Sequence, residues 1–278
     1  MLSYRHGYHA GNFADVLKHL VLVEVLRYLG EKEKPFEYID THAGAGAYSL
    51  ASQQADKLRE YAQGIGRLYA TTHADLQPYL DLIRRFNNGG ELRRYPGSPK
   101  IAEALLRPQD RGWLFELHPT DFPLLESAFR DNGRFRVAQE DGFEGLIRLL
   151  PPTARRGCIL IDPAYEVKED YERVVKTLVR AHKRFASGIY CLWYPVVARH
   201  RIERMERSLI ASGIRDIQCF ELSREDAADA GGMQATGMLV VNPPWTLMAR
   251  MQTLLPLLCR KLDGRDRYSF RCETLVGE

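Results

Sequence analysis

Residues 36–46 read Phe-Glu-Tyr-Ile-Asp-Thr-His-Ala-Gly-Ala-Gly, and this stretch decides the fold. Its first five residues, 36–40, form a short apolar run that ends in an acid, as expected of a buried strand. The residues that follow, 41–46, place two glycines in a loop, where the backbone can approach a ligand closely. A strand that runs directly into a glycine loop indicates a ligand site at the carboxyl edge of a parallel α/β sheet.

Six further short strands are expected along the chain, and most of them end beside a polar residue. They cover 112–116, 135–138, 157–162, 188–194, 217–222 and 237–242, and helical patterns at 121–130, 170–185 and 202–212 lie between them. Strands alternating with helices predict an α/β fold with a seven-stranded, mostly parallel sheet that is covered on both faces. The spacing of apolar residues also predicts an N-terminal helix over 12–28 that ends at Gly30.

Segment 51–95 interrupts the alternation of strands and helices. It is far longer than the usual strand-to-helix loop, and it carries helical patterns of its own at 58–69 and 76–86. We therefore expect a small inserted helical subdomain at 51–95 and a main domain made of 1–50 and 96–278. The end of the insertion is basic, which fits either a surface for a polyanion or a solvated charged edge; the residues are Arg84, Arg85, Arg93 and Arg94.

Composition fits an ordinary folded protein of 278 residues, with 45% hydrophobic and 27% charged side chains. The 39 basic and 36 acidic residues nearly balance, so the net charge of +3 does not by itself establish a polyanionic partner. The five cysteines are odd in number and include no Cys-x-x-Cys pair, which fits a reducing compartment. We find neither a signal sequence nor a membrane-spanning apolar stretch, and so expect a cytoplasmic protein without a membrane partner.

Two ligands compete for the glycine loop, a dinucleotide and S-adenosylmethionine. The dinucleotide fingerprint requires a third glycine three residues after the second, where this chain has Ser49. It also requires an acid about 20 residues further on, whereas Glu116, the acid that ends the second strand, comes only after the insertion. The spacing therefore disfavours a dinucleotide.

S-adenosylmethionine makes different demands, and polar residues at three strand ends meet them. Its binding requires close backbone approach at the loop, a carboxylate for the ribose hydroxyls and a polar group for the adenine amine. The first demand is satisfied by Asp40, Gly44 and Gly46, the second by Glu116, and the third by Asp141 with Gly142. Because the carboxyl ends of parallel strands share one edge of a sheet, these residues are expected to form one site. We therefore expect S-adenosylmethionine as the cofactor.

Two motifs containing proline resemble each other, Asp-Pro-Ala-Tyr at 162–165 and Asn-Pro-Pro-Trp at 242–245. Each combines an acid or amide, a rigid turn and an aromatic ring, which together could hold a planar base with an amino group. Asp162 ends the fourth strand, which lies beside the first in the strand order of methyltransferases, whereas Asn242 ends the seventh. We therefore expect 162–165 to be catalytic, and 242–245 to be a turn with Trp245 packed on the sheet edge.

Further motifs accompany these residues. The N-terminal stretch 4–19 reads Tyr-Arg-His-Gly-Tyr-His-Ala-Gly-Asn-Phe-Ala-Asp-Val-Leu-Lys-His, and Tyr-Pro-Gly-Ser-Pro, Glu-Leu-His-Pro and Leu-Trp-Tyr-Pro begin at 95, 116 and 192. With 40–46, 141–142 and 162–165, they resemble the RlmJ family, bacterial methyltransferases of N6 of one adenine in 23S ribosomal RNA. The likeness covers essentially the whole chain.

This resemblance implies a Rossmann-like class I methyltransferase fold with a small helical insertion. It implies an RNA contact from Tyr4 and methyl-donor contacts from His19, His42, Ser98, Glu116, Asp141, Gly142 and Asp162. In the same N-terminal arm, His6 is expected to contact RNA, and Lys18 to pair with a phosphate or carboxylate near the donor. Histidines at this spacing could hold zinc, but no cysteine supports such a site and methyl transfer to an amine requires no metal, so none is expected.

The expected reaction is direct methyl transfer to an adenine that is flipped out or single-stranded. The Asp162 carboxylate and the Pro163 carbonyl would accept hydrogen bonds from the amine, and Tyr165 would stack on the base. The family's second proline is replaced by Ala164, which we expect to loosen the motif by about 1 kcal/mol while activity is retained.

Three functions fit these residues. The leading hypothesis is a monomeric enzyme that acts on 23S ribosomal RNA, either protein-free or early in assembly. A DNA adenine-N6 methyltransferase would share every catalytic residue. Proteins of this family have also been connected with the use of external DNA, so a nucleic-acid-binding protein without turnover is the third.

Overall fold

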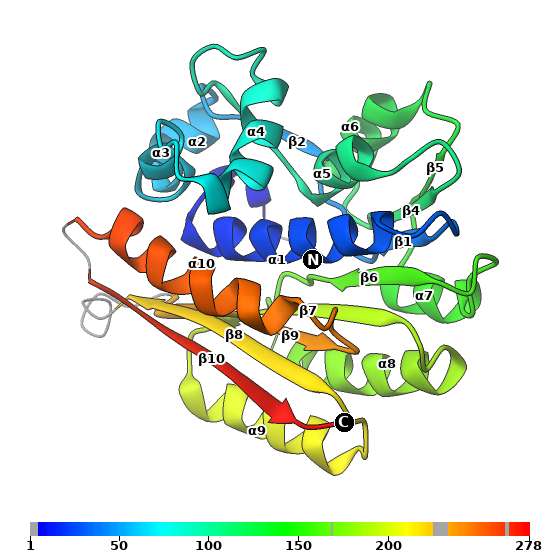
Figure 1. The fold of residues 1–278 in the computed structure, drawn as a ribbon. Helices are drawn as coiled ribbons and strands as arrows, with labels where there is room; N and C mark the ends of the chain where they lie inside the picture. The colour runs from blue at the N-terminus through cyan, green and yellow to red at the C-terminus, as the bar shows by residue number, and fades with distance from the viewer. Residues whose placement is uncertain (1–4, 168, 225–232, 265–266) are drawn as a thin grey trace.

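A central sheet with helices on both faces dominates the computed structural model, which describes residues 5–167, 169–224, 233–264 and 267–278 (Figure 1). Tyr4, the predicted RNA contact, lies outside these residues. Within the described ranges, no helix combines the length and the apolar character needed to cross a membrane.

The main sheet has eight strands in the order β10-β8-β9-β7-β6-β1-β4-β5. The strands are β1 Glu37–Asp40, β4 Arg111–Phe115, β5 Phe135–Ala138, β6 Gly157–Ile161, β7 Ile189–Val196, β8 Ile217–Arg224, β9 Ala235–Val241 and β10 Tyr268–Val276. β1 pairs in parallel with β4 on one side and with β6 on the other, so the direction of chain progression reverses between β1 and β6. Ligands of open α/β sheets bind at such a switch point.

The α/β architecture matches the prediction, but the sheet is larger and less parallel than expected. All seven predicted strands are present, and β10 adds an eighth, antiparallel to β8 at the edge of the sheet. β10 could not be predicted from the sequence, because its apolar residues alternate with polar ones and no run of buried residues marks it. β9 also runs antiparallel to both β7 and β8, which makes the sheet mixed.

Helices cover the sheet in two layers, and each layer has its own apolar core (Figure 1). On one face pack α1 Phe13–Gly30, α5 Ser98–Leu105, α6 Asp121–Phe129 and α10 Leu247–Leu262. On the other face pack α7 Gly142–Leu149, α8 Asp170–Arg184 and α9 Arg199–Ala211. The two layers leave the carboxyl ends of the parallel strands available for a site.

Helix α1 is buried along almost its whole length, and it carries polar residues into the interior. Asn12 caps its start by accepting hydrogen bonds from the N–H groups of Ala14 and Asp15, both at 3.0 Å. Most of the helix is apolar on every side, as expected of a helix enclosed by other elements. Asp15, Lys18 and His19 are the buried exceptions. The predicted helix over 12–28 is therefore confirmed, and its polar first half lies near the strand ends.

Segment 51–95 contains helices α2 Gln53–Leu58, α3 Ile65–Leu68 and α4 Gln77–Phe86. The predicted helix over 76–86 corresponds to α4. The predicted helix over 58–69 is broken, because Arg59 adopts a left-handed φ of 51° that ends α2. A two-stranded antiparallel sheet, β2 Ala47–Ser49 with β3 Arg94–Pro96, flanks the segment.

Candidate active site

A cavity of about 670 Å³ lies at the carboxyl ends of the parallel strands, beside the switch point. Its volume lies within the range typical of small-molecule sites. Most of the predicted site residues line it: His6, Lys18, His19, His42, Gly44, Ser98, Glu116, Asp141, Gly142, Asp162, Pro163 and Tyr165. The lining does not include Asp40, which is fully buried.

Glu116 holds the glycine loop in place at the end of β4. One of its carboxylate oxygens accepts a hydrogen bond from the Gly44 N–H at 2.8 Å, and the other accepts one from the His118 N–H at 2.6 Å. Gly44 has a φ of 60°, which glycine adopts without strain. Burial raises the pKa of Glu116, and the two N–H groups offset this only in part.

Asp40 is buried beneath the glycine loop and holds it through hydrogen bonds. Its carboxylate accepts hydrogen bonds from the hydroxyls of Tyr38 and Ser98, both at 2.7 Å, and from the His42 N–H at 3.3 Å. Burial raises the pKa of Asp40 in spite of these donors, and burial lowers the pKa of His42 to about 4. Asp40 therefore orients Ser98 and the loop, and its role at the cofactor site stays a prediction.

Asp141 both caps α7 and pairs with α8. One oxygen accepts a hydrogen bond from the Phe143 N–H at 2.9 Å, and the other lies 2.5 Å from the Arg173 guanidinium. Burial would raise the pKa of Asp141, but Arg173 outweighs it and the pKa lies below its usual value. At Gly142 a Cβ would lie 1.8 Å from the Thr41 carbonyl oxygen, so only glycine allows α7 to approach the loop this closely.

Lys18 connects the N-terminal region to Asp162. Its ammonium lies 2.6 Å from Asp162 and 2.9 Å from Asp15, one turn earlier on α1. Asp15 also lies 2.8 Å from the His6 Nε2 and accepts a hydrogen bond from the Gly11 N–H at 2.8 Å. Burial opposes the charges, but the partners outweigh it: the pKa of Lys18 lies well above its usual value and that of Asp15 well below. A charged lysine is thus fixed beside Asp162.

Asp162 follows β6 and faces the cavity together with the buried Pro163. Burial raises the pKa of Asp162 to about 6, and the attraction of Lys18 offsets this only in part. The carboxylate is therefore mostly ionised at pH 7 and can accept hydrogen bonds there.

Tyr165 adds an aromatic wall beside Asp162. Its φ of 52° is unusual for a bulky residue and is the kind of strain found at functional sites. Its hydroxyl donates to the Trp193 carbonyl at 2.7 Å, and its ring packs 4.6 Å from the Tyr171 ring and 5.9 Å from the Trp193 ring, measured between centroids. An acid, a proline and an aromatic residue thus meet at one wall of the cavity.

Several residues that line the cavity were not predicted from the sequence, among them Asp15, Trp193 and Arg173. Asp15 precedes Lys18 by three positions on a helix, and that spacing could have suggested the pair. Trp193 lies in the Leu-Trp-Tyr-Pro motif at a strand end. Arg173 comes from the first turn of α8, and no local pattern relates it to Asp141.

The second proline motif lies at the opposite edge of the sheet. β9 runs antiparallel to β7, so Asn242, which follows β9, lies beside the start of β7. The Asn242 amide donates to the carbonyls of Ala186 and Gly188, both at 2.7 Å, and fixes the turn that enters β7. Trp245 is 82% exposed, so the expectation that its ring packs on the sheet edge is wrong.

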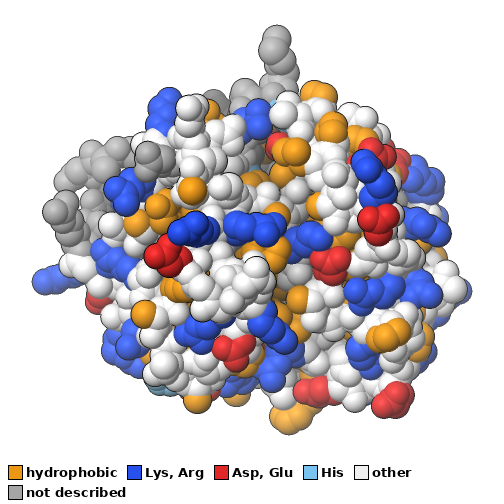
Figure 2. All heavy atoms as spheres, turned by 90° about the horizontal axis from the view of Figure 1, so that it is seen from above, with side chains coloured by type: hydrophobic (Ala, Val, Ile, Leu, Met, Phe, Trp, Pro, Cys, Tyr) orange, Lys and Arg blue, Asp and Glu red, His pale blue; other side chains and the backbone are white. Residues whose placement is uncertain are grey.

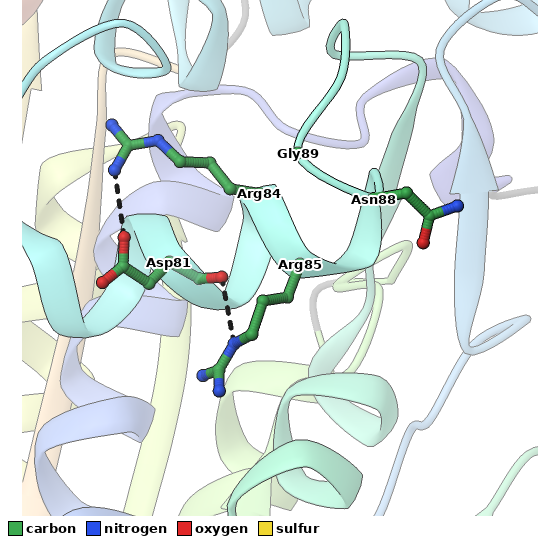
Figure 3. Close-up of a pocket in the computed structure, with 5 residues that line it drawn as sticks. All are labelled: Asp81, Arg84, Arg85, Asn88 and Gly89. Atoms are coloured by element: carbon green, nitrogen blue, oxygen red, sulfur yellow. Dashed lines mark hydrogen bonds and ion pairs between the residues drawn. The ribbon is translucent and has the colours of Figure 1, made fainter.

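A second hollow, of about 470 Å³, lies on α4. Figure 3 shows Arg84 paired with the carboxylate of Asp81, and Arg85 donating to the Asp81 carbonyl. Arg84 also donates to the carbonyls of Tyr69 and Thr71. Arg84 therefore holds the segment together. The other three basic residues predicted at this end of the insertion are exposed, namely Arg85, Arg93 and Arg94.

Comparison with known folds supports a methyltransferase-like architecture. A crystal structure of a Legionella pneumophila protein is 36% identical, with a TM-score of 0.89 over 96% of this chain and 98% of that one. A probable spermidine synthase from Corynebacterium glutamicum has a TM-score of 0.52 at 10% identity, covering 97% of this chain and 78% of that one, so its likeness concerns the fold alone. The predicted class I methyltransferase-like fold is thereby confirmed.

Comparison of sequences identifies closer relatives. The family model described as "Ribosomal RNA large subunit methyltransferase D, RlmJ" matches residues 33–272. The Ribosomal RNA large subunit methyltransferase J of Escherichia coli is 53% identical over 94% of both chains. The protein of the same name from Haemophilus influenzae is 48% identical over the full length of both chains. The chain therefore belongs to the RlmJ family of ribosomal RNA large subunit methyltransferases.

Proposed function

We propose that this protein transfers a methyl group from S-adenosylmethionine to N6 of a specific adenine in 23S ribosomal RNA. The observation that carries the proposal is the Asp162–Pro163 wall with its charged partner Lys18, in the same cavity as Glu116 and Asp141. Asp162 and Pro163 suit an exocyclic amine. Glu116 and Asp141 suit the adenosine part of a methyl donor. The names of the relatives support ribosomal RNA as the substrate.

The residues present fit S-adenosylmethionine. Glu116 offers a carboxylate to the ribose hydroxyls, and Asp141 with Gly142 lies at the strand end expected for adenine. Gly44 and Gly142 line the cavity, and a Cβ would meet the Tyr48 hydroxyl at the first position and the Thr41 carbonyl at the second. The Nε2 of His19 is buried with no hydrogen-bond partner among the described residues, which leaves a polar atom for a ligand to satisfy. When bound, this donor would supply the electrophilic methyl group.

The protein's own groups would orient the amine and stabilise charge. The ionised Asp162 and the Pro163 carbonyl would accept the two N–H hydrogens, which would direct the nitrogen lone pair towards the methyl group. Positive charge that develops on the nitrogen would be stabilised by the Asp162 carboxylate. Lys18 would keep Asp162 ionised near neutral pH, and Tyr165 would stack on the base. After transfer, the nitrogen would release one proton and become neutral again.

A basic face supports a nucleic-acid substrate. Figure 2 shows a band of Lys and Arg side chains, interspersed with acidic ones, across the face that carries α2 to α6. Such a surface would attract the phosphate backbone in a manner that depends on salt. In the N-terminal arm, we propose RNA contacts for Tyr4 and His6.

We further propose that 51–95 is an inserted helical subdomain of an otherwise Rossmann-like domain formed by 1–50 and 96–278. The pairing of β2 with β3 at the two ends of the segment supports this division. We expect the enzyme to act as a monomer in the cytoplasm, on RNA that is protein-free or in early assembly.

Incubation with radiolabelled S-adenosylmethionine and deproteinised 23S ribosomal RNA tests the proposal. Label should appear at N6 of one adenine, and duplex DNA of similar length should accept much less. Equal transfer to duplex DNA would favour a DNA adenine methyltransferase. Nucleic-acid binding without transfer to either substrate would favour a binding protein without turnover.

A further inference from the structure

His19 presents an unpaired nitrogen at the wall of the donor cavity. The residue is 1% exposed and lines the cavity. Its Nδ1 lies 2.8 Å from the hydroxyl of Tyr95, whereas its Nε2 is buried and has no hydrogen-bond partner among the described residues. Buried polar atoms in proteins are almost always paired, so this nitrogen is expected to meet a ligand.

Two buried tyrosines extend the contact at Nδ1 into segment 51–95. The Tyr95 hydroxyl on β3 lies 2.8 Å from the Tyr79 hydroxyl on α4, and both side chains are fully buried. The rings of His19 and Tyr95 also stack, with centroids 5.4 Å apart and an interplanar angle of 24°. A continuous chain of hydrogen bonds therefore runs from α4 through β3 to the wall of the cavity.

The available acceptors determine which group donates in each of the two hydrogen bonds that join His19, Tyr95 and Tyr79. Burial raises the pKa of Tyr79 and of Tyr95, so both hydroxyls keep their protons. If the His19 Nδ1 donated to Tyr95, Tyr95 would donate to Tyr79, and the Tyr79 proton would have no acceptor among the described residues. In the opposite direction, Tyr79 donates to Tyr95 and Tyr95 donates to Nδ1, so both tyrosine protons have an acceptor.

The second direction leaves the histidine proton on Nε2. Burial lowers the pKa of His19 to about 3, so the ring is neutral at physiological pH and carries a single N–H. That N–H is then the atom that faces the ligand.

We infer that Tyr79 and Tyr95 are positioning residues that fix His19 as an Nε2–H donor to the carboxylate of the methyl donor's amino-acid end. The identity of this ligand rests on the proposed function. Glu116 and Asp141 suit the hydroxyls and the amine of adenosine but would repel a carboxylate. Lys18 is already bound to two carboxylates, whereas the His19 Nε2 has no partner among the described residues, so we assign the carboxylate to His19. Segment 51–95 thereby acts on donor affinity through two hydroxyls that never touch the donor.

The first test examines the ligand-free protein. Nitrogen-15 NMR of histidine-labelled wild type should show His19 as the Nε2–H tautomer, with the signal assigned from its loss in His19→Gln. Tyr95→Phe should give a mixture of tautomers, and Tyr79→Phe a smaller change in the same direction. Tyr190→Phe is a matched control, because Tyr190 is equally buried and its hydroxyl donates to the Phe185 carbonyl at 2.8 Å, away from His19 in the hydrogen bonds of the described residues. An Nδ1–H tautomer in the wild type would overturn the inference.

The second test compares calorimetric affinities for S-adenosylmethionine and for decarboxylated S-adenosylmethionine, which lacks the carboxylate. Tyr95→Phe should weaken the first by about fivefold or more and leave the second unchanged, whereas Tyr190→Phe should change neither. Equal weakening of both ligands would mean that Tyr95 acts through packing, and would overturn the inference. If wild type bound neither ligand, the proposed function and the carboxylate assignment would both fail, while the NMR result would judge the tyrosine chain separately.

Discussion

The two proline motifs differ little in sequence and greatly in surroundings. Asp162 follows a strand at the switch point, lies beside the buried Lys18 and lines the cavity. Asn242 follows a strand that runs the other way, and its amide is used by two backbone carbonyls at the opposite edge of the sheet. The aromatic residue of the first motif packs against two rings, whereas that of the second is exposed.

The direction of the preceding strand, more than the residue types of the motif, decides whether a motif lies at the ligand site. In a parallel strand, the carboxyl end faces the ligand edge. In β9, the same end faces away. Lys18 pairs with the Asp162 carboxylate at the cavity, whereas the Asn242 amide donates both its hydrogens to backbone carbonyls of the turn.

The largest expected difference between the motifs is in activity. Asp162→Ala should lower the rate of RNA methylation by about 10²–10³-fold, because it removes the acceptor that orients the amine and stabilises its charge. Asn242→Ala should keep the rate per folded molecule within about twofold. Both rates are measured with labelled donor, after circular dichroism has established the folded fraction. A comparable loss in Asn242→Ala would erase the proposed distinction.

The next largest difference should appear in how the methylation rate depends on pH, which should involve Asp162 and not Asn242. Because the pKa of Asp162 is raised to about 6, the ionised fraction and the rate should fall about tenfold per unit as the pH drops below 6. Asn242→Ala should follow the wild-type profile, since an amide does not titrate. Residual activity of Asp162→Asn should be flat between pH 5 and 7 in the same assay. A wild-type rate that stays constant down to about pH 5 would be incompatible with this role of the carboxylate.

Substitutions at Asn242 should lower the free energy of unfolding, although they leave the activity nearly unchanged. Asn242→Ala removes the donor to two carbonyls and places alanine at a φ of 51°, so we expect a loss of about 2 kcal/mol in the free energy of unfolding. Asn242→Gly tolerates the backbone angle but still lacks the amide, and chemical denaturation of both variants separates the two causes. Equal stability of Asn242→Ala and wild type would show that the turn does not depend on the amide.

The smallest expected effect concerns Ala164. Its N–H makes no hydrogen bond to the part of the chain that the structure describes, so a proline there would remove none. Ala164→Pro should raise the methylation rate by up to about fivefold, through about 1 kcal/mol of added rigidity. Steady-state kinetics with the RNA substrate would reveal the change. An increase of several orders of magnitude would mean that the natural alanine impairs the enzyme.

Much of the fold followed from local patterns, since strand-ending acids and helical spacing predicted seven strands and the N-terminal helix. The eighth strand was missed because edge strands have only a weak apolar signal. The antiparallel direction of β9 depends on how distant strands pair, which no short window of sequence records.

The site followed from sequence where its residues end consecutive strands, as Glu116, Asp141 and Asp162 do. Asp40 was placed correctly along the chain, but its burial against Tyr38 and Ser98 was not foreseen. The hydrogen bonds that join Tyr79, Tyr95 and His19 connect residues up to 76 positions apart in the sequence and exist only through tertiary packing. The family resemblance supplied residue roles that spacing alone did not.

The most direct test of the central claim is the single-turnover rate of methyl transfer to a 23S ribosomal RNA fragment, with wild type and Asp162→Asn both saturated with S-adenosylmethionine. Saturation removes donor affinity from the comparison, and asparagine keeps the shape of the side chain while losing its charge. The rate should fall by about 10²-fold or more in Asp162→Asn, even at donor concentrations that saturate each protein. An unchanged single-turnover rate would contradict the assignment of Asp162 as the group that positions the amine.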